Sequence, residues 1–286
     1  MATTIKGGFA QLAANLEITP LQSTTTSTRQ QNVRDAVAAG LTVLDSFLAG
    51  SYARSTMIGP LNEADIDIMV VLDASYFTQY TPATLLAKVR EVLLQTYSTT
   101  PKISPNGQAV TISFTDFTVD VVPAFKRKGG GYLIPDSSTG AWIQTNPTTH
   151  STTLTAHNAA HHGALVPLIK LIKGWNRTIS NPFVGFYLEL MSADMLYNVT
   201  ISDFPSGVRY LLDKGREKIK LKQIDPAGYN GQVNGLRSGT VADAVARFTL
   251  AHNRAVKAEA HAAANDIRLA TDEWRKIFGD YYPAYG

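Results

Sequence analysis

The chain has 286 residues, of which 44% are hydrophobic and 17% are charged, and its formal net charge is +3. It contains no cysteine, which excludes disulfide frameworks and thiolate metal sites, and it has no apolar run long enough to span a bilayer. The small positive charge suits an anionic ligand but is too small for a surface that coats nucleic acid. The N-terminus lacks the basic-then-apolar order of a secretion signal, so we expect a cytoplasmic protein of one or two domains with no membrane attachment.

The first half of the chain alternates predicted helices and strands. Residues 9–16 have helical spacing, and the Ser/Thr run at 23–28 could cap a second helix that begins near Arg29 and ends at Gly40. A strand at 43–48 then leads into a glycine turn and a helical turn. The remaining predicted elements are strands at 67–72, 110–114 and 118–122, the last ended by Pro123, and a helix at 82–97.

The second half of the chain is predicted to be helical. Its apolar periodicity favours helices over 154–175, 183–197 and the proline-free tract 241–278, and no strong strand pattern follows residue 147. A loop-like stretch at 146–150 separates the two halves. We therefore predict a core lobe over 1–150 and a helical lobe with a C-terminal tail over 151–286.

Three aspartates form a candidate metal site, and two of them lie where an unpaired charge would be costly. Asp65 and Asp67, at i and i+2, project from the same face of a strand, and Asp120 lies in another apolar strand. An Asp-x-Asp pair alone is more often a solvated strand end, but Asp67 and Asp120 are embedded among Ile, Met and Val. Metal coordination would offset that cost. Two Mg²⁺ ions, or Mn²⁺ in their place, about 3.5–4 Å apart could bind a triphosphate and activate an attacking hydroxyl.

A Gly-Ser turn precedes these acids and suits phosphate binding. Gly50 has no Cβ to keep the backbone away from phosphate oxygens, and the Ser51 hydroxyl and the amides of the following helical turn can donate to them, aided by the helix dipole. No GxxxxGK[ST] sequence occurs, so this is not a Walker loop. A Gly-Ser pair alone is uninformative; followed by Asp65, Asp67 and Asp120 in this order, it predicts phosphoryl transfer from nucleoside triphosphates.

These motifs resemble those of the DNA polymerase β-like nucleotidyltransferase superfamily. Within it, segments 47–56, 60–72 and 119–125 resemble the bacterial cGAS/DncV-like nucleotidyltransferases (CD-NTases), which are cyclic oligonucleotide synthases of anti-phage (CBASS) systems. Segments 168–176 and 186–190 resemble that family's helices, so the resemblance covers nearly the whole chain. It implies an α+β fold in which a core lobe with a mixed sheet and helices packs on a C-terminal helical lobe, with the active site in the cleft.

The resemblance also implies roles for individual residues in the core lobe. Asp65 and Asp67 would hold both metal ions, and Asp120 would complete the metal site and help to activate the hydroxyl. Gly50 and Ser51 would grip the donor triphosphate. Arg54, in the same segment, would also bind nucleotide.

In the helical lobe, the resemblance implies that Lys173 contacts a triphosphate and that Phe186 stacks on a nucleobase. The alternatives are a solvated helix lysine and a core phenylalanine. The family often has Ser where Gly185 stands in this sequence, so one hydroxyl that would contact phosphate is missing.

The implied activity is the condensation of nucleoside triphosphates, ATP among them, into a cyclic di- or trinucleotide second messenger, with release of pyrophosphate. A separate effector would then bind the product in anti-phage defence. Alternatives are transfer to an RNA 3′ end or another hydroxyl acceptor, and a catalytically inactive nucleotide-binding module. The absence of cysteine excludes DNA sensing through a zinc module.

Four further features leave alternatives open. The resemblance implies that Gly286 could be joined to a target by ubiquitin-like conjugation machinery or meet a regulatory protein; the alternative is a frayed end. His157, His161 and His162 could place imidazoles on one helical face, for metal binding or as a plain polar face. Glycines 129–131 favour a mobile hairpin near the cleft over a phosphate loop. The basic run 126–128 could meet phosphate or solvent.

Overall fold

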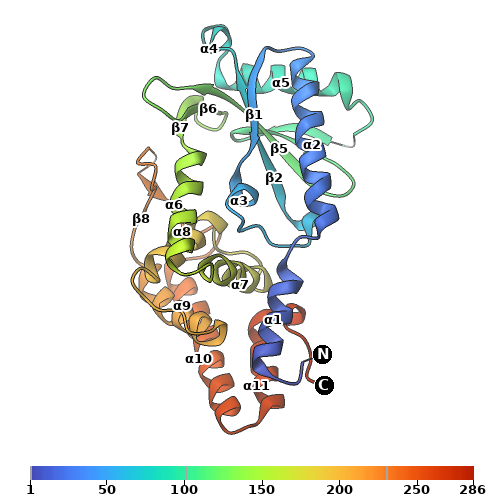
Figure 1. Ribbon diagram of the computed structural model, residues 1–286. Helices are drawn as coiled ribbons and strands as arrows, with labels where there is room; N and C mark the ends of the chain where they lie inside the picture. Colours follow the sequence, from blue (N-terminus) through green and yellow to red (C-terminus); the bar gives the residue numbers. More distant parts are fainter. Residues whose placement is uncertain (1, 101, 230) are drawn as a thin grey trace. The chain divides into compact units, whose positions relative to one another are not determined.

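The computed structural model describes residues 2–100, 102–229 and 231–286 (Figure 1). The chain forms two compact units. The sheet unit contains the described residues of 18–152 and 226–229, and the helical unit contains 2–17, 153–225 and 231–286. The change of unit between Thr152 and Thr153 lies close to the boundary expected near residue 150, but residues 2–17 group with the helices. No helix in the described ranges is both long and apolar enough to cross a membrane.

The sheet unit is built on one mixed sheet. Its main path runs β1 (Val43–Leu48), β2 (Asp65–Leu72), β5 (Thr118–Lys126), β4 (Ala109–Ser113) and β3 (Lys102–Asn106), while β6 (Tyr132–Asp136) pairs with β5 and with β7 (Ala141–Thr145). Among the strand pairs of the described residues in this sheet, only the central pair, β2 and β5, is parallel, and the others are antiparallel. The fold is therefore the α+β class expected from the sequence, although β3, β6 and β7 were not predicted.

One face of the sheet carries the main core of this unit. Alternate residues of β2 and β5, such as Ile66, Ile68, Val119 and Val121, are completely buried in one cluster with residues of α2 (Pro20–Ala38) and α5 (Pro82–Thr96). The period-2 pattern of these strands explains why the intervening residues point to the opposite face. The short elements of this unit are α3 (Gly50–Ala53), η1 (Leu61–Glu63) and α4 (Ser75–Gln79).

The Ser/Thr run at 23–28 does not cap a helix, contrary to the prediction. Helix α2 begins earlier, at Pro20, where Thr19 and Gln22 form a capping box and proline occupies the first turn. The run lies inside the helix, where four of its hydroxyls donate to carbonyls four residues back, as Thr26 does to Gln22 at 2.9 Å. The capping box therefore fixes the helix start despite the weak helix propensity of the run.

Proline also fails to end a strand where the sequence predicted it. Strand β5 continues through Pro123 to Lys126, with Pro123 opposite Val70 of β2. The β4–β5 ladder has already ended at Val121, so the missing N–H removes no bond on that side.

The helical unit is more segmented than its apolar periodicity suggested. The tract 154–175 is divided between α6 (Pro147–Ala160) and α7 (Leu165–Thr178), and the tract 241–278 between α10 (Val241–Ala263) and α11 (Ile267–Phe278). Residues with positive φ occupy both breaks, with Gly163 at 85° and Asn265 at 63°. The other elements are α1 (Ile5–Leu16), α8 (Gly185–Met195), α9 (Phe204–Lys218), the two-residue strands β8 (Gln223–Ile224) and β9 (Gln232–Val233), and η2 (Gly279–Tyr281).

Aromatic packing explains why α1 belongs to the helical unit. The ring of Phe9, on α1, lies 4.8 Å from that of Trp274 on α11 and 5.4 Å from that of Tyr282, both edge-on. All three side chains are almost completely buried. Periodicity identifies the apolar face of α1, but it does not identify the partner of that face, which comes from the far end of the chain.

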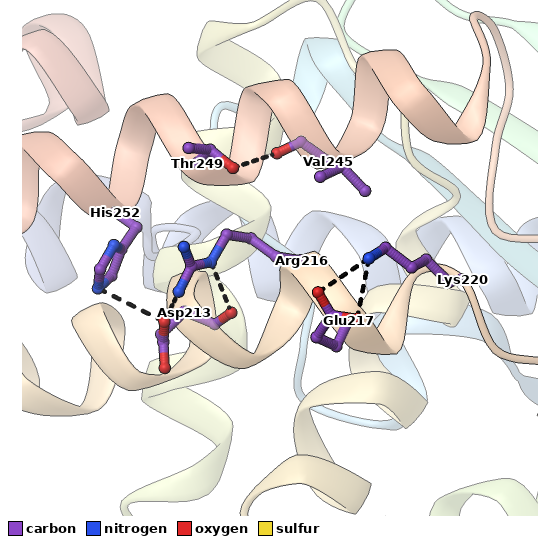
Figure 2. Close-up of polar contacts among 7 residues, drawn as sticks. All are labelled: Asp213, Arg216, Glu217, Lys220, Val245, Thr249 and His252. Carbon is purple, nitrogen blue, oxygen red and sulfur yellow. Dashed lines mark hydrogen bonds and ion pairs between the residues drawn. The ribbon is translucent and has the colours of Figure 1, made fainter.

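A polar network joins α9 to α10 (Figure 2). Asp213 accepts a short hydrogen bond from the Arg216 guanidinium on the same helix, and its Oδ1 lies 3.7 Å from Nε2 of His252 on α10. Burial lowers the pKa of His252, and the nearby positive charge of Arg216 lowers it further. This histidine is therefore predominantly neutral at pH 7, and the network is chiefly an arginine–carboxylate pair.

Candidate active site

The three predicted acids lie on the face of the sheet opposite the main core. Asp65 and Asp67 are the first and third residues of β2, and Asp120 is the third residue of β5. In the parallel register Asp67 is directly opposite Asp120, and Asp65 is opposite Thr118. Neighbouring strands are about 4.8 Å apart, so the register makes these side chains immediate neighbours.

Two of the acids accept hydrogen bonds from threonines on adjacent strands. Asp120 Oδ1 accepts from Thr111 Oγ1 on β4 at 2.5 Å, and Asp65 accepts a short bond from Thr118 on β5. Burial raises the pKa of Asp120; the Thr111 hydrogen bond opposes that rise, and the negative charge of Asp65 adds to it. Asp120 is thus harder to ionise than an ordinary aspartate.

Gly50 is required by its contact with the acids. Its φ of 58° lies in the left-handed region, and a Cβ on Gly50 would overlap the Oδ2 atom of Asp67. The N–H of Ala49 donates to the Asp67 carbonyl at 2.8 Å, which holds the turn against β2. The sequence suggested that glycine admits phosphate; the structure adds that it makes room for a carboxylate.

Ser51 and Arg54 lie in and directly after the single helical turn α3. With four residues, α3 has only a small macrodipole, which reduces the dipole contribution expected from the sequence. Its first N–H groups have no acceptor within the helix, so they and the Ser51 hydroxyl remain suitable donors to an anion. Arg54 is the C-cap residue, and its N–H donates to the Gly50 carbonyl at 3.4 Å.

The donor set fits a hard divalent cation such as Mg²⁺, which prefers carboxylate oxygens. Within the described residues, however, no three His, Asp or Glu side chains already converge as a metal-binding group. Each threonine hydrogen bond engages one oxygen of Asp65 or Asp120 and leaves the other oxygen of that carboxylate for an ion.

The two predicted residues of the helical unit lie on two helices that contact each other, Lys173 on α7 and Phe186 on α8. A Cβ on Gly185, the residue before Phe186, would lie 3.5 Å from the lysine Cε. Lys173 Nζ lies 3.1 Å from Oε1 of Glu189, a carboxylate that is 1% exposed. Lys173 is thus a paired, largely buried lysine, not the solvated helix lysine considered as its alternative. Phe186 is half-buried.

The remaining sequence features have structural explanations. Helix α6 ends at Ala160, so His161 and His162 belong to the turn that follows; with His157 and Tyr197 they line a cavity of about 380 Å³. Glycines 129–131, all with positive φ, form the predicted hairpin between β5 and β6. There the Arg127 guanidinium donates to the Gly130 carbonyl at 3.1 Å and lies 4.9 Å from the Tyr229 ring centre.

Sequence reasoning missed the two threonines. Thr118 precedes Asp120 by two residues on the same strand, so the period-2 pattern could have placed both on one face. Thr111 has no such local signal. Only the antiparallel register of β4 and β5 brings it opposite Asp120.

Comparison with known proteins identifies the family of this chain. Residues 2–158 match the model of the Second Messenger Oligonucleotide or Dinucleotide Synthetase domain. The cyclic AMP-AMP-AMP synthase of Acinetobacter sp. (strain ATCC 27244 / 9458) is 26% identical over 299 aligned residues, which cover 96% of this chain and 84% of that protein.

Solved structures show the same fold. The Escherichia coli MS115-1 CdnC structure with ATP matches with a TM-score of 0.78 at 18% identity, over 98% of this chain and 99% of that one. The Vibrio cholerae DncV cyclic AMP-GMP synthase with nonhydrolyzable GTP gives 0.71 at 15% identity, over 88% and 72%. Since the domain match covers more than half of the sequence, this chain belongs to the Second Messenger Oligonucleotide or Dinucleotide Synthetase family, the nucleotidyltransferases of the cGAS/DncV-like kind.

Proposed function

We propose that this enzyme condenses nucleoside triphosphates into a cyclic di- or trinucleotide in a reaction that depends on Mg²⁺, with Mn²⁺ as a substitute. The proposal rests on the strand register, which places Asp67 beside Asp120, and on Gly50, which packs against Asp67. The Acinetobacter relative is a cyclic AMP-AMP-AMP synthase, which favours ATP as a substrate.

In this mechanism Asp65, Asp67 and Asp120 would hold two divalent ions. The ions would neutralise triphosphate charge and make an attacking ribose hydroxyl more acidic. The hydroxyl oxygen forms a bond to the α-phosphorus, the bond from that phosphorus to the bridging oxygen of pyrophosphate breaks, and pyrophosphate leaves. Asp120 can help to take up the hydroxyl proton only when it is ionised, which its raised pKa makes dependent on pH.

The other site residues would bind the nucleotides. Gly50 and Ser51 would hold the donor triphosphate through backbone N–H groups and the serine hydroxyl, and Arg54 would add a positive charge. Lys173, oriented by Glu189, would contact phosphate, and Phe186 would stack on a base. Only one set of acids is proposed, so the same site would form each successive phosphodiester bond.

The product would act in the cytoplasm as a second messenger, bound by a separate effector in anti-phage defence.

A conjugating or regulatory protein at Gly286 would bind a C-terminal tail that packs against the N-terminus. The Ala2 N–H donates to the Ala284 carbonyl at 3.0 Å, Ala2 forms a β-bridge with Tyr285, and Tyr282 is 1% exposed. Residues 284–286 are themselves exposed, which suits conjugation at Gly286. Mass spectrometry of the protein from cells with its native operon tests this, and only unmodified Gly286 there would contradict it.

The test of the activity is incubation of the purified protein with labelled ATP, GTP, CTP and UTP, singly and mixed, with Mg²⁺ or Mn²⁺. Phosphatase treatment and mass spectrometry should then reveal a phosphatase-resistant cyclic product, whose bases the mass identifies. Linear extension of an added RNA, with no cyclic product under any condition, would contradict the proposal and support the RNA-tailing alternative.

A further inference from the structure

Thr111 is joined to the proposed metal site by one short hydrogen bond. It lies on β4 as the antiparallel register partner of Asp120, and its hydroxyl donates to Asp120 Oδ1 at 2.5 Å. Asp67 is the register partner of Asp120 on the other side, so Asp67, Asp120 and Thr111 form one row across three strands.

We propose that Thr111 is a positioning residue that fixes Asp120 for divalent-metal binding, an inference that rests on the proposed function. A carboxylate has two oxygens, and the Thr111 bond engages Oδ1, which leaves Oδ2 and the remaining lone pairs for an ion. Hydrogen-bonding partners of this kind orient ligands and tune metal affinity in many metalloproteins.

Threonine is well suited to this role at the centre of a sheet. Strand β4 is held by β3 on one side and β5 on the other, so the register places the Thr111 side chain opposite Asp120, and its β-branch restricts χ1 to few orientations of the hydroxyl. Valine at this position would keep the shape and remove the donor. Serine would keep the donor with a freer side chain.

A second acid also accepts a hydrogen bond from a threonine on the adjacent strand. Thr118 on β5 is the register partner of Asp65 on β2 and donates to its Oδ1 atom. Two of the three acids are thus oriented by a threonine on the adjacent strand. Thr111 is the sharper test, because its partner Asp120 is more buried than the exposed Asp65.

The experiment measures Mn²⁺ binding by electron paramagnetic resonance, with a non-hydrolysable ATP analogue, and the Mg²⁺ concentration that gives half-maximal rate. Thr111→Val should weaken Mn²⁺ binding about 10–100-fold. Thr111→Ser should stay within about threefold of wild type, because the donor is retained. Ser104→Ala is the matched control, since Ser104 faces Thr111 one strand further from Asp120 and should change neither quantity.

Thermal unfolding separates positioning from folding. If Thr111→Val unfolds, Thr111→Ala replaces it as the variant without a donor. Mn²⁺ affinity within twofold of wild type in a folded variant without the donor would overturn the inference. A different outcome would separate the two proposals. If the wild-type protein makes no cyclic product but Thr111→Val still weakens Mn²⁺ binding, the proposed function is contradicted and the positioning role of Thr111 stands.

Discussion

The two faces of the sheet unit carry different residues on the same strands. On β2 and β5, Ile66, Ile68, Val119 and Val121 are buried against the helices, whereas the acids occupy alternate positions on the other face. A shift of one residue in register would exchange the faces. Burial of the apolar set therefore fixes where the acids lie, so that the core of the unit determines the geometry of the site. Substitutions on each face test whether the apolar face sets stability and the polar face sets activity.

The largest effect is expected on the polar face. Asp67→Asn keeps the shape but removes the charge that would bind metal, so the rate of pyrophosphate release should fall at least about 10³-fold, equivalent to roughly 4 kcal/mol. The melting temperature should change by no more than a few °C, because the apolar face is untouched. A variant that retains more than a tenth of the wild-type rate would refute the metal role of Asp67.

The next effect is expected on the adjacent residue, which points to the apolar face. Ile68→Ala should reduce the free energy of unfolding by about 3 kcal/mol, measured by urea denaturation, because Ile68 is completely buried. The rate per folded molecule should stay within about threefold. Ile68→Val, which removes one methylene, should cost only about 1 kcal/mol. A large loss of rate with unchanged stability would show that the faces are not separable in this way.

A substitution at Gly50 tests the contact between the turn and Asp67 on the polar face. Gly50→Ala should displace the Asp67 carboxylate and reduce the rate about 10²-fold, the usual cost of a misplacement of about 1 Å. Gly107→Ala is the matched control: its φ is 59°, close to the 58° of Gly50, but nothing lies within 4 Å of its Cβ position. Gly107→Ala should lower the free energy of unfolding somewhat but change the reaction rate little. Equal losses of rate would attribute the effect to backbone strain alone.

The smallest effect concerns the stability cost of the buried acid. Burial raises the pKa of Asp120, so the folded state binds this proton more readily than the unfolded state. The ionised group therefore costs stability at neutral pH, and the cost disappears as the pH falls below the unfolded value near 3.8. In EDTA, Asp120→Asn should raise the melting temperature at pH 7 by at most a few °C, and the difference should shrink toward pH 4. A lower melting temperature at pH 7 would contradict this.

Much of the fold followed from local patterns, and the errors have local causes. Alternation predicted β4, apolar runs predicted β1 and most of β2, and helical periodicity predicted α5. The start of α2 was misplaced because a capping box at Thr19 outweighed the Ser/Thr run. Apolar periodicity continued across Asn265, where one residue with positive φ divides a helix. A single dihedral can interrupt a helix without disturbing the pattern on either side of it.

For the site, the sequence by itself determined which residues could take part and on which face they lie. The i, i+2 spacing put Asp65 and Asp67 on one side of a strand, and the apolar residues between them had to be buried. Only the tertiary structure decided which strands are neighbours: that Asp120 lies beside Asp67, that Thr111 donates to Asp120, and that Gly50 makes room for Asp67. The physical reason is that period and propensity act over a few residues, whereas strand pairing depends on which apolar surfaces bury each other across the whole unit.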